Sequence, residues 1–366
     1  MPNIEFYIGI MSGTSLDGID AVLADLSQPA PKQLAEAHLT FDPGLRSELA
    51  TLCDGSSDNE LERAMEAGLK LAKCYAEAAR QTLQSAGLAA SQISAIGCHG
   101  QTVRHRPAKG FTVQINNPAL LAELTGIAVV ADFRSRDIAA GGQGAPLVSA
   151  FHRAVFFRGD KDRVIANVGG IANLTCLPRS GETTGFDCGP GNGLMDAWVQ
   201  HHLGEPYDRG GAWAMSGKIQ PALLDRLWAM AYFLQAPPKS TGRELFNLAW
   251  LQTHDVSAYL PQDVQRTLLE LTAQGISHHV AAYAGGAREV FVCGGGARNA
   301  ALMRALQARL PRSEVTTTDQ LGIPVMNVEA LAFAWLAKQA MAGKPGNLPA
   351  VTGARHPAVL GAIYPR

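Results

Sequence analysis

The chain has 366 residues, 47% of them hydrophobic and 17% charged, and a formal net charge of −1. A chain of this length favours two domains over a single hydrophobic core. The near-zero net charge gives no electrostatic reason to expect binding to nucleic acid or to an anionic membrane. No apolar run approaches the roughly 20 residues of a membrane span, and the N-terminus (M-P-N-I-E) lacks the basic region of a signal peptide. The six cysteines form no C-x-x-C pair and no zinc spacing, which favours reduced thiols in the cytoplasm.

The first glycine-rich segment lies between two predicted strands, residues 5–10 and 21–26. It reads M-S-G-T-S-L-D-G-I-D. Small residues, hydroxyls and backbone N–H groups can surround a phosphate, and a nearby carboxylate can hold Mg²⁺ directly or through water. Asp17 and Asp20 are both candidates for that carboxylate. For this segment alone, a polar hairpin without a ligand is the alternative.

Further strands are predicted at residues 35–41, 95–98, 111–114 and 127–131, with a long helix from about residue 60 to Gly87. The strand at 95–98 runs into H-G-Q-T. His99 and Gln101 therefore follow a strand end, where α/β sheets usually contact their ligands, although a single histidine there is often structural.

The segment D-F-R-S-R-D-I-A-A-G-G-Q-G-A-P-L, residues 132–147, has no apolar periodicity. This composition predicts an ordered loop rather than a packed element. Arg134 in this segment can clamp a carboxylate or a phosphate, or pair with the neighbouring acids. We place the domain boundary near this loop.

The centre of the chain carries N-V-G-G-I-A-N-L, which predicts two strands (164–168 and 171–177) joined by a turn at Gly169 and Gly170. After a polar loop comes F-D-C-G-P-G-N, in which Asp187 precedes a loop that starts a helix. A backbone anion site beside a carboxylate is what phosphoryl transfer to an oxygen acceptor requires. A plain hairpin followed by a helix, with Asp187 as a turn or cap residue, is the alternative.

The second half contains predicted helices near residues 194–202, 219–233 and 261–284, and a buried strand at 289–293 that runs into G-G-G-A-R-N. Three glycines between a strand and a helix can form the floor for a nucleotide base and sugar. A strand at 314–317 and a helix at 328–341 follow, with Glu329 in the first turn of that helix. Both halves begin with a strand, a glycine-rich hairpin and a strand, which indicates two related domains.

No Walker loop, G-x-G-x-x-G fingerprint or G-x-S-x-G elbow occurs. Instead, the three glycine loops resemble the acetate and sugar kinase/Hsp70/actin superfamily. This resemblance implies an α/β, two-domain actin-like ATPase (ribonuclease H-like) fold with a central interdomain cleft. The domains would be residues 1–133 and 134–366, and the last helix could pack back on the first domain.

The quoted motifs, together with C-H-G-Q-T, more closely resemble the anhydro-N-acetylmuramic acid kinase family. The resemblance implies that ATP, 1,6-anhydro-N-acetylmuramic acid and water give N-acetylmuramic acid 6-phosphate and ADP, in bacterial cell-wall recycling. It also implies ATP and Mg²⁺ as cofactors, a cytoplasmic homodimer, and no nucleic-acid or membrane partner. Another sugar or carboxylate kinase of the superfamily, or a non-enzymatic actin- or Hsp70-like module, remains open.

The resemblance assigns a role to each motif residue. Asp187 would be the base that activates the water, and Glu329 would help to position that water or would act only as a partner of the helix dipole. His99, Gln101 and Arg134 would hold the sugar or its lactyl carboxylate, and Asp17 or Asp20 would lie nearest the metal. Cofactor binding falls to Gly13, Thr14, Ser15, Leu16, Asp17, Gly18, Ile19, Asp20, Gly169, Gly170, Asn173, Gly294, Gly295, Gly296 and Asn299.

Overall fold

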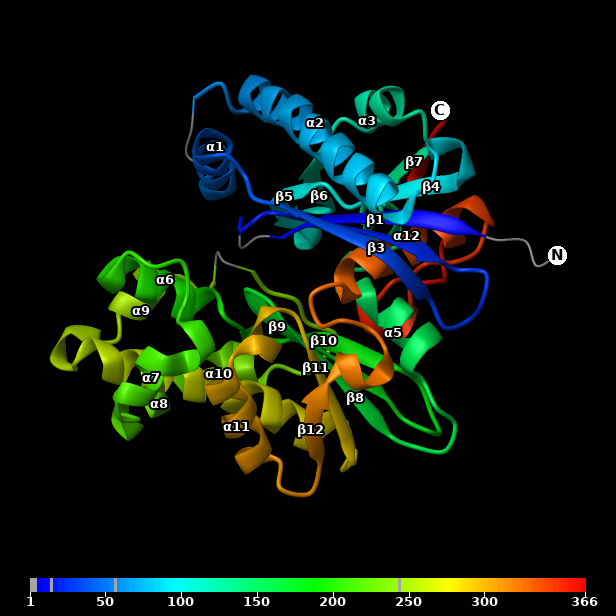
Figure 1. The fold of residues 1–366 in the computed structure, drawn as a ribbon. Helices are drawn as coiled ribbons and strands as arrows, with labels where there is room; N and C mark the ends of the chain where they lie inside the picture. Colours follow the sequence, from blue (N-terminus) through cyan, green and yellow to red (C-terminus); the bar gives the residue numbers. More distant parts are fainter. Residues whose placement is uncertain (1–4, 14–15, 56–57, 243–244) are drawn as a thin grey trace. The chain divides into compact units, whose positions relative to one another are not determined.

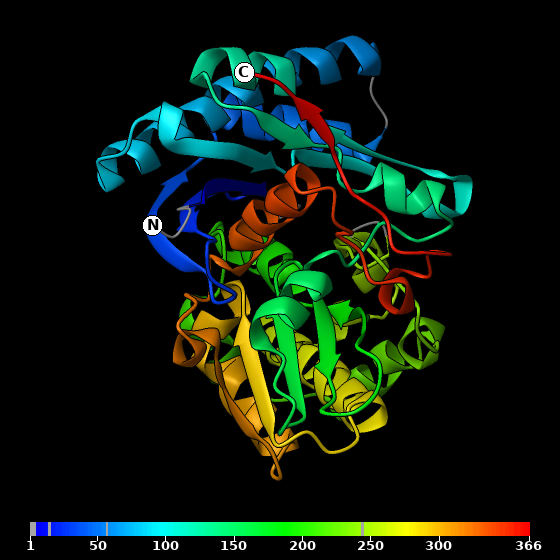
Figure 2. The ribbon, with the colours of Figure 1, turned by 90° about the vertical axis from the view of Figure 1, so that its right-hand side faces the viewer.

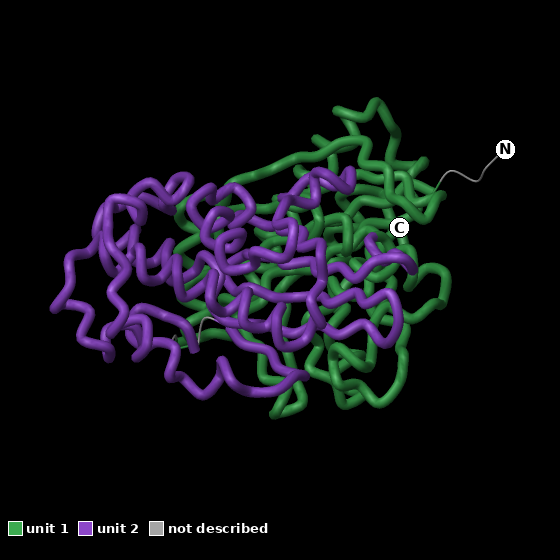
Figure 3. The backbone as a smooth tube through the Cα atoms, turned by 90° about the horizontal axis from the view of Figure 1, so that it is seen from below, with its two compact units in different colours: residues 1–155, 327–366 green, residues 156–326 purple. Residues whose placement is uncertain are grey.

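The computed structural model describes residues 5–13, 16–55, 58–242 and 245–366. The chain divides into two compact units: unit 1 comprises residues 1–155 and 327–366, and unit 2 comprises residues 156–326 (Figure 3). The expected boundary after residue 133 differs from this division, because residues 134–155 and the C-terminal segment both belong to unit 1.

Unit 1 is built on a mixed sheet in the order β13-β7-β4-β1-β2-β3. The first three strands form an antiparallel meander, and β4 and β7 extend the sheet in parallel from β1. Near the C-terminus, β13 pairs antiparallel with β7 at the sheet edge (Figure 2). A separate two-stranded sheet holds β5 and β6. The strands are β1 (Phe6–Ser12), β2 (Ile19–Asp25), β3 (Lys32–Leu39), β4 (Ile93–Cys98), β5 (Gln101–Arg106), β6 (Phe111–Ile115), β7 (Val129–Ala131) and β13 (Ala362–Tyr364).

Two long helices cover opposite faces of this sheet (Figure 1). The face with Ile8 and Ile10 packs on the apolar side of α2, and the face with Gly9 and Gly97 packs on α12. A Cβ atom at Gly9 would overlap the carbonyl oxygen of Ala330, so glycine is required for α12 to approach this closely. The helices of unit 1 are α1 (Pro43–Asp54), α2 (Glu60–Ala86), α3 (Pro118–Thr125), α4 (Ser135–Ala139), α5 (Val148–Phe156, which ends at the unit boundary), α12 (Val328–Met341) and α13 (Pro349–Thr352).

Unit 2 repeats the topology of unit 1. Its sheet has the order β10-β9-β8-β11-β12, with β8, β9 and β10 antiparallel and β11 and β12 added in parallel to β8. The expectation of two related halves is therefore met at the level of strand order. The strands are β8 (Arg163–Val168), β9 (Ile171–Leu177), β10 (Thr184–Pro190), β11 (Glu289–Cys293) and β12 (Glu314–Thr317).

The core of unit 2 lies where the strands meet α10, whose apolar side chains Val264, Leu268 and Ile276 are fully or almost fully buried. The helices of this unit are α6 (Gly193–Leu203), α7 (Ala212–Ser216), α8 (Pro221–Trp228), α9 (Leu248–Gln252), α10 (Pro261–Tyr283) and α11 (Ala300–Arg309). Among the described residues of both units, no helix is long and apolar enough to span a bilayer.

Candidate active site

In unit 1, the structure brings four of the expected site residues together at the end of β4. Nε of Arg134 donates to Nε2 of His99 at 3.0 Å, and Nε2 of Gln101 donates to the carbonyl oxygen of Gly13 at 3.1 Å. Burial, followed by the charge of Arg134, holds the pKa of His99 well below its ordinary value. His99 is therefore neutral near pH 7, with Nε2 as an acceptor.

Two polar atoms in this group are buried without a hydrogen-bond partner among the described residues: Nδ1 of His99 and Oε1 of Gln101. Buried polar atoms in native proteins are nearly always paired, and an orphaned pair calls for an explanation. A ligand that presents hydroxyl and amide groups would satisfy both atoms.

The segment expected as an ordered loop, residues 132–147, is instead partly helical and packed, because Asp137 anchors it. The Asp137 carboxylate is fully buried and accepts from the Gly144 backbone N–H at 2.7 Å, from Nδ2 of Asn347 at 2.6 Å and from Oγ1 of Thr352 at 2.7 Å. Gly144 in turn accepts from Nη1 of Arg134 at 2.6 Å. The prediction of a loop was therefore wrong for α4. The residues that anchor this segment, Asn347 and Thr352, lie more than 200 residues away along the chain, so the local sequence does not reveal them.

In the first glycine hairpin, main-chain atoms are more available to a ligand than most of the described side chains are. Thr14 and Ser15 lie outside the described residues. Leu16 has φ 55° and a buried side chain, and Ile19 is buried as well, so both can reach a nucleotide only through main-chain atoms. A Cβ atom at Gly18 would lie 2.5 Å from the carbonyl oxygen of Leu39, which explains why this position is glycine.

The two acids of this hairpin differ in environment. Asp17 is exposed, whereas Asp20 is partly buried and lies 2.7 Å from Nδ1 of His38. Burial raises the pKa of Asp20, His38 opposes that rise, and the charge of Asp17 adds to it. Carboxylate oxygens suit Mg²⁺, which usually keeps several waters and takes only one or two carboxylates. The described residues contain no cluster of three or more potential ligands, and the pair fits such a water-rich site.

In unit 2, the Gly169-Gly170 hairpin and the segment after β10 lock together through main-chain hydrogen bonds. The Gly169 carbonyl accepts from Asn192 N–H at 2.7 Å, and the Gly170 carbonyl accepts from Gly191 and Gly193 N–H groups at 3.0 Å each. A Cβ atom at Gly191 would overlap the Gly169 carbonyl oxygen. Glycine at position 191 is therefore required for the two turns to pack.

The third glycine turn joins the same group. Gly294 has φ +77°, and a Cβ atom at Gly296 would overlap the side chain of Val168, the residue before the hairpin. A Cβ atom at Gly295 would lie 3.3 Å from Nδ2 of Asn192. The second and third expected phosphate or nucleoside loops therefore meet at the ends of β8 and β11.

Two asparagines of the expected cofactor set have distinct surroundings. The Oδ1 atom of Asn299 accepts from the Leu302 N–H at 3.1 Å and caps α11, so this side chain shapes the helix start. The Oδ1 atom of Asn173, on β9, is buried without a partner among the described residues.

Asp187 lies within strand β10, just before the segment that leads into α6, as the sequence predicts. It pairs with Asn173 on β9, at the point where the register shifts before Gly189. Its side chain is 7% exposed, and Oδ2 accepts from the Thr241 backbone N–H at 2.9 Å. The alternative of a turn or cap residue does not fit this place within a strand. A buried carboxylate held by a main-chain donor is placed by the fold rather than by a turn.

Lys239 is a site residue that the sequence motifs did not indicate. Its Nζ atom is hydrogen-bonded to Nε2 of His279 at 2.8 Å and donates to the Tyr232 carbonyl at 3.0 Å, while its own carbonyl accepts from the Asp187 N–H at 3.1 Å. The only local indication of Lys239 in the sequence is the segment P-P-K-S-T-G, which has no apolar periodicity and places a lysine directly after two prolines.

Glu329 is in the first turn of α12 in unit 1 and is partly buried.

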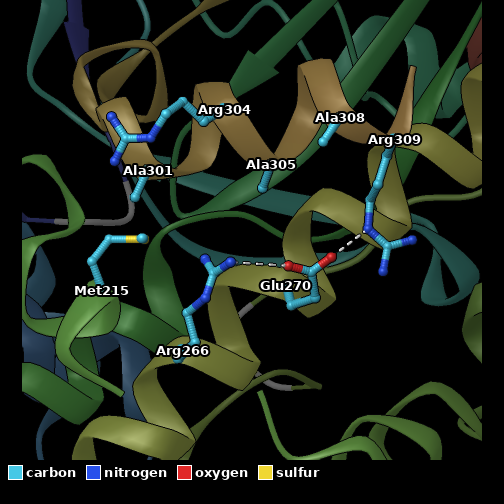
Figure 4. A pocket seen from close by; sticks show the side chains of 8 residues that line it. All are labelled: Met215, Arg266, Glu270, Ala301, Arg304, Ala305, Ala308 and Arg309. Atoms are coloured by element: carbon cyan, nitrogen blue, oxygen red, sulfur yellow. Dashed lines mark hydrogen bonds and ion pairs between the residues drawn. The ribbon is translucent and has the colours of Figure 1, made fainter. Parts of the chain in front are cut away.

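A pocket of about 290 Å³ lies between α7, α10 and α11 in unit 2, next to the third glycine turn (Figure 4). Glu270 is at its centre, 2.6 Å from Arg309 and 3.7 Å from Arg266. Nη1 of Arg266 is buried without a partner among the described residues. Alanines of α11 form one wall. The lining residues are Met215, Arg266, Glu270, Ala301, Arg304, Ala305, Ala308 and Arg309.

Two units with one shared strand order, each with a glycine-rich hairpin between its first two strands, define the actin-like ATPase fold. A buried carboxylate beside such a hairpin is the arrangement of a phosphotransferase.

Residues 5–366 match the family described as anhydro-N-acetylmuramic acid kinase. The protein of that name from Nitrosospira multiformis is 54% identical over 362 residues, covering 98% of this chain and 99% of that relative. The one from Cupriavidus pinatubonensis is 54% identical over 369 residues, covering 98% of each. The one from Nitrosomonas europaea is 52% identical over 362 residues, covering 98% of this chain and 99% of that relative. The chain belongs to the anhydro-N-acetylmuramic acid kinase family.

Proposed function

We propose that this kinase opens the 1,6-anhydro ring of 1,6-anhydro-N-acetylmuramic acid with water and phosphorylates O6, giving N-acetylmuramic acid 6-phosphate and ADP. Family membership supports the substrate. The observation that carries the mechanism is the buried Asp187 carboxylate, which a main-chain donor holds beside the glycine turns of unit 2. Its identity as the base is part of the proposal.

The substrate dictates what the base must do. O6 bridges to C1, so the sugar has no free 6-hydroxyl group to phosphorylate. Water attacks C1, the C1–O6 bond breaks, and O6 forms a bond to the γ-phosphorus of ATP while the bond to ADP breaks. Asp187 takes the proton that the water loses. A positioned general base typically contributes about 10²–10⁴-fold in rate.

The nucleotide is proposed to bind through the three glycine loops. Main-chain N–H groups of residues 13–20 and 169–173 would hold the phosphates, and residues 294–299 would support the nucleoside. Asp17 or Asp20 would hold Mg²⁺, which supplies charge stabilisation at the phosphates. The pocket beside α11 extends the third loop, and its alanine wall and Glu270 carboxylate suit a flat base and ribose hydroxyls.

The sugar is proposed to bind His99, Gln101 and Arg134. Their two unpartnered buried atoms fit the hydroxyl and acetamido groups of an amino sugar, and the Arg134 guanidinium suits the lactyl carboxylate. Glu329 either positions the water or acts as a partner of the α12 dipole.

We further propose that the enzyme acts as a cytoplasmic homodimer in the recycling of peptidoglycan sugars, without a nucleic-acid or membrane partner. The family resemblance supports these assignments. Another superfamily kinase or a non-enzymatic module is not favoured, because relatives with 52–54% identity across nearly the whole chain carry the one name.

The decisive test of this function is mass spectrometry of products formed from ATP, Mg²⁺ and 1,6-anhydro-N-acetylmuramic acid in ¹⁸O-water. One ¹⁸O at C1 of a phosphorylated sugar is expected, since the attacking oxygen comes from water. The same reaction with free N-acetylmuramic acid is the control for simple hydroxyl phosphorylation. A phosphorylated product without label at C1 would overturn the proposed chemistry.

The pocket beside α11 gives a separate prediction. Ala305→Phe places a phenyl ring in the space assigned to the nucleoside. The KM for ATP is expected to rise about 10-fold, equivalent to about 1.4 kcal/mol of binding free energy, with the KM for the sugar unchanged. Ala282→Phe, at an exposed helical position in α10 of the same unit, is the control. Equal ATP kinetics in both variants would remove the pocket from nucleotide binding.

A further inference from the structure

We propose that Lys239 is a positioning residue for Asp187: its buried side chain anchors residues 239–241, so that the Thr241 backbone N–H orients the Asp187 carboxylate toward the attacking water. This inference rests on the proposed role of Asp187 as the base. It assigns a function in the reaction to a side chain far from the glycine loops in sequence.

The main chain of this segment contacts Asp187 at two points. The Asp187 N–H donates to the Lys239 carbonyl at 3.1 Å, and the Thr241 N–H donates to Oδ2 of Asp187 at 2.9 Å. The Asp187 carbonyl also accepts from the Tyr232 hydroxyl at 2.8 Å. A shift of residues 239–241 would therefore move the carboxylate directly.

The side chain of Lys239 fixes this segment in place. Lys239 is 5% exposed, and its Nζ atom lies 2.8 Å from Nε2 of His279, 3.0 Å from the Tyr232 carbonyl and 3.4 Å from the Phe233 carbonyl. An ammonium group has three donors, and here three acceptors surround it. A buried ammonium group with fewer acceptors would be destabilised by the loss of its hydration. The three acceptors therefore favour a single position of the Lys239 side chain.

The neighbouring groups keep the arrangement intact at neutral pH. Burial lowers the pKa of His279 on α10 to about 4, so its Nε2 remains an acceptor. Burial also lowers the pKa of Lys239 to about 8, although Cys188 and Asp187 on β10 oppose that shift. Above that pH Lys239 loses one donor and its charge, and the anchor weakens.

Two aromatic side chains also contribute to the environment of the Lys239 ammonium group. The Nζ atom lies 4.7 Å from the centroid of the Tyr232 ring and 6.0 Å from that of the Phe186 ring, so two aromatic rings lie close to the ammonium group. Cation–π attraction and carbonyl acceptors together stabilise a charge at such a site.

The test compares Lys239→Met with Lys239→Arg and measures kcat, both KM values and the pH profile. Lys239→Met is expected to lower kcat about 10- to 100-fold, because misplacing a catalytic group by about 1 Å can cost that much, while the KM for ATP stays within about threefold. Lys239→Arg is expected to restore part of kcat and to move the alkaline decline of activity above pH 8, because arginine keeps its charge. A loss of stability alone would not shift that decline.

A second pair of variants tests the link to Asp187 without changing the lysine. Thr241→Pro removes the N–H donor and is expected to lower kcat as Lys239→Met does, whereas Thr241→Val keeps the donor and is expected to lower kcat by a much smaller factor. The Lys239→Met/Thr241→Pro double variant is expected to lose little more than either single variant, since both act through one contact.

The outcomes separate this inference from the proposed function. A near-normal kcat in Lys239→Met, with Asp187→Asn inactive, would overturn the positioning role and leave the base intact. A near-normal kcat in Asp187→Asn would overturn the base itself. If Lys239→Met does not fold, the Thr241 pair decides, and equal activity of Thr241→Pro and Thr241→Val overturns the inference.

Discussion

Replacement of Asp187 by asparagine is expected to lower kcat by at least about 100-fold, the lower end of what a positioned base contributes. Asparagine has nearly the same shape, and its oxygen can still accept from the Thr241 N–H, which holds the present carboxylate at 2.9 Å. The fold of β10 should therefore persist. What is lost is the ability to take a proton from water, since an amide is not a base at neutral pH.

The measurement is steady-state turnover of the anhydro sugar, together with ATP binding by calorimetry. ATP affinity is expected to stay within about threefold, because the change removes a group that acts only during the reaction. Asp162→Asn is the matched control: Asp162 is a partly exposed acid of the same unit that likewise accepts from a main-chain N–H group, that of Arg179 at 2.7 Å. A near-normal rate for Asp187→Asn would exclude this residue as the base.

Gly9→Ala is expected to destabilise unit 1 by about 3 kcal/mol, the upper part of the range for overpacking a core. The added Cβ atom would overlap the Ala330 carbonyl oxygen and lie 2.7 Å from the Ala334 nitrogen. Both atoms are backbone of α12, so no side chain can rotate away. The helix must shift from the sheet, and the buried contacts of its alanine-rich face weaken.

Hydrogen exchange resolved by unit is the appropriate measurement, because a two-unit chain need not unfold in one step. Faster exchange is expected in β1 and α12, with unit 2 unaffected. Gly159→Ala is the control, since a Cβ atom at that exposed glycine would meet nothing within 4 Å. Equal exchange in the two variants would mean that α12 does not pack on the sheet as closely as the structure shows.

Elements with a strong local pattern were predictable from the sequence. Strands β11 and β12 and helix α12 occupy the residues expected for them, Glu289–Cys293, Glu314–Thr317 and Val328–Met341, because apolar or β-branched residues there are bounded by glycine, proline or polar residues. The repeated hairpin also indicated the repeated topology.

Features that depend on distant partners were not predictable. Residues 132–147 lack periodicity, yet Asp137 ties them to Asn347 and Thr352. The hydrogen bonds between Asp187 and residues 239–241 have no local signal in the sequence. The motifs identified the glycines at the turns, whereas Lys239 follows only from the buried acceptors that surround its side chain.

The discontinuity of unit 1 has a consequence during synthesis. Its first 155 residues leave the ribosome before α12 and β13, which belong to the segment from residue 327 onward. Until then the sheet face around Gly9 and Gly97 lacks its covering helix, and β7 lacks its edge neighbour. Unit 2 is continuous and can complete its fold first. Nascent chains that stall before residue 327 therefore expose an uncovered sheet and an open strand edge, the features that chaperones bind and that aggregate when left unprotected.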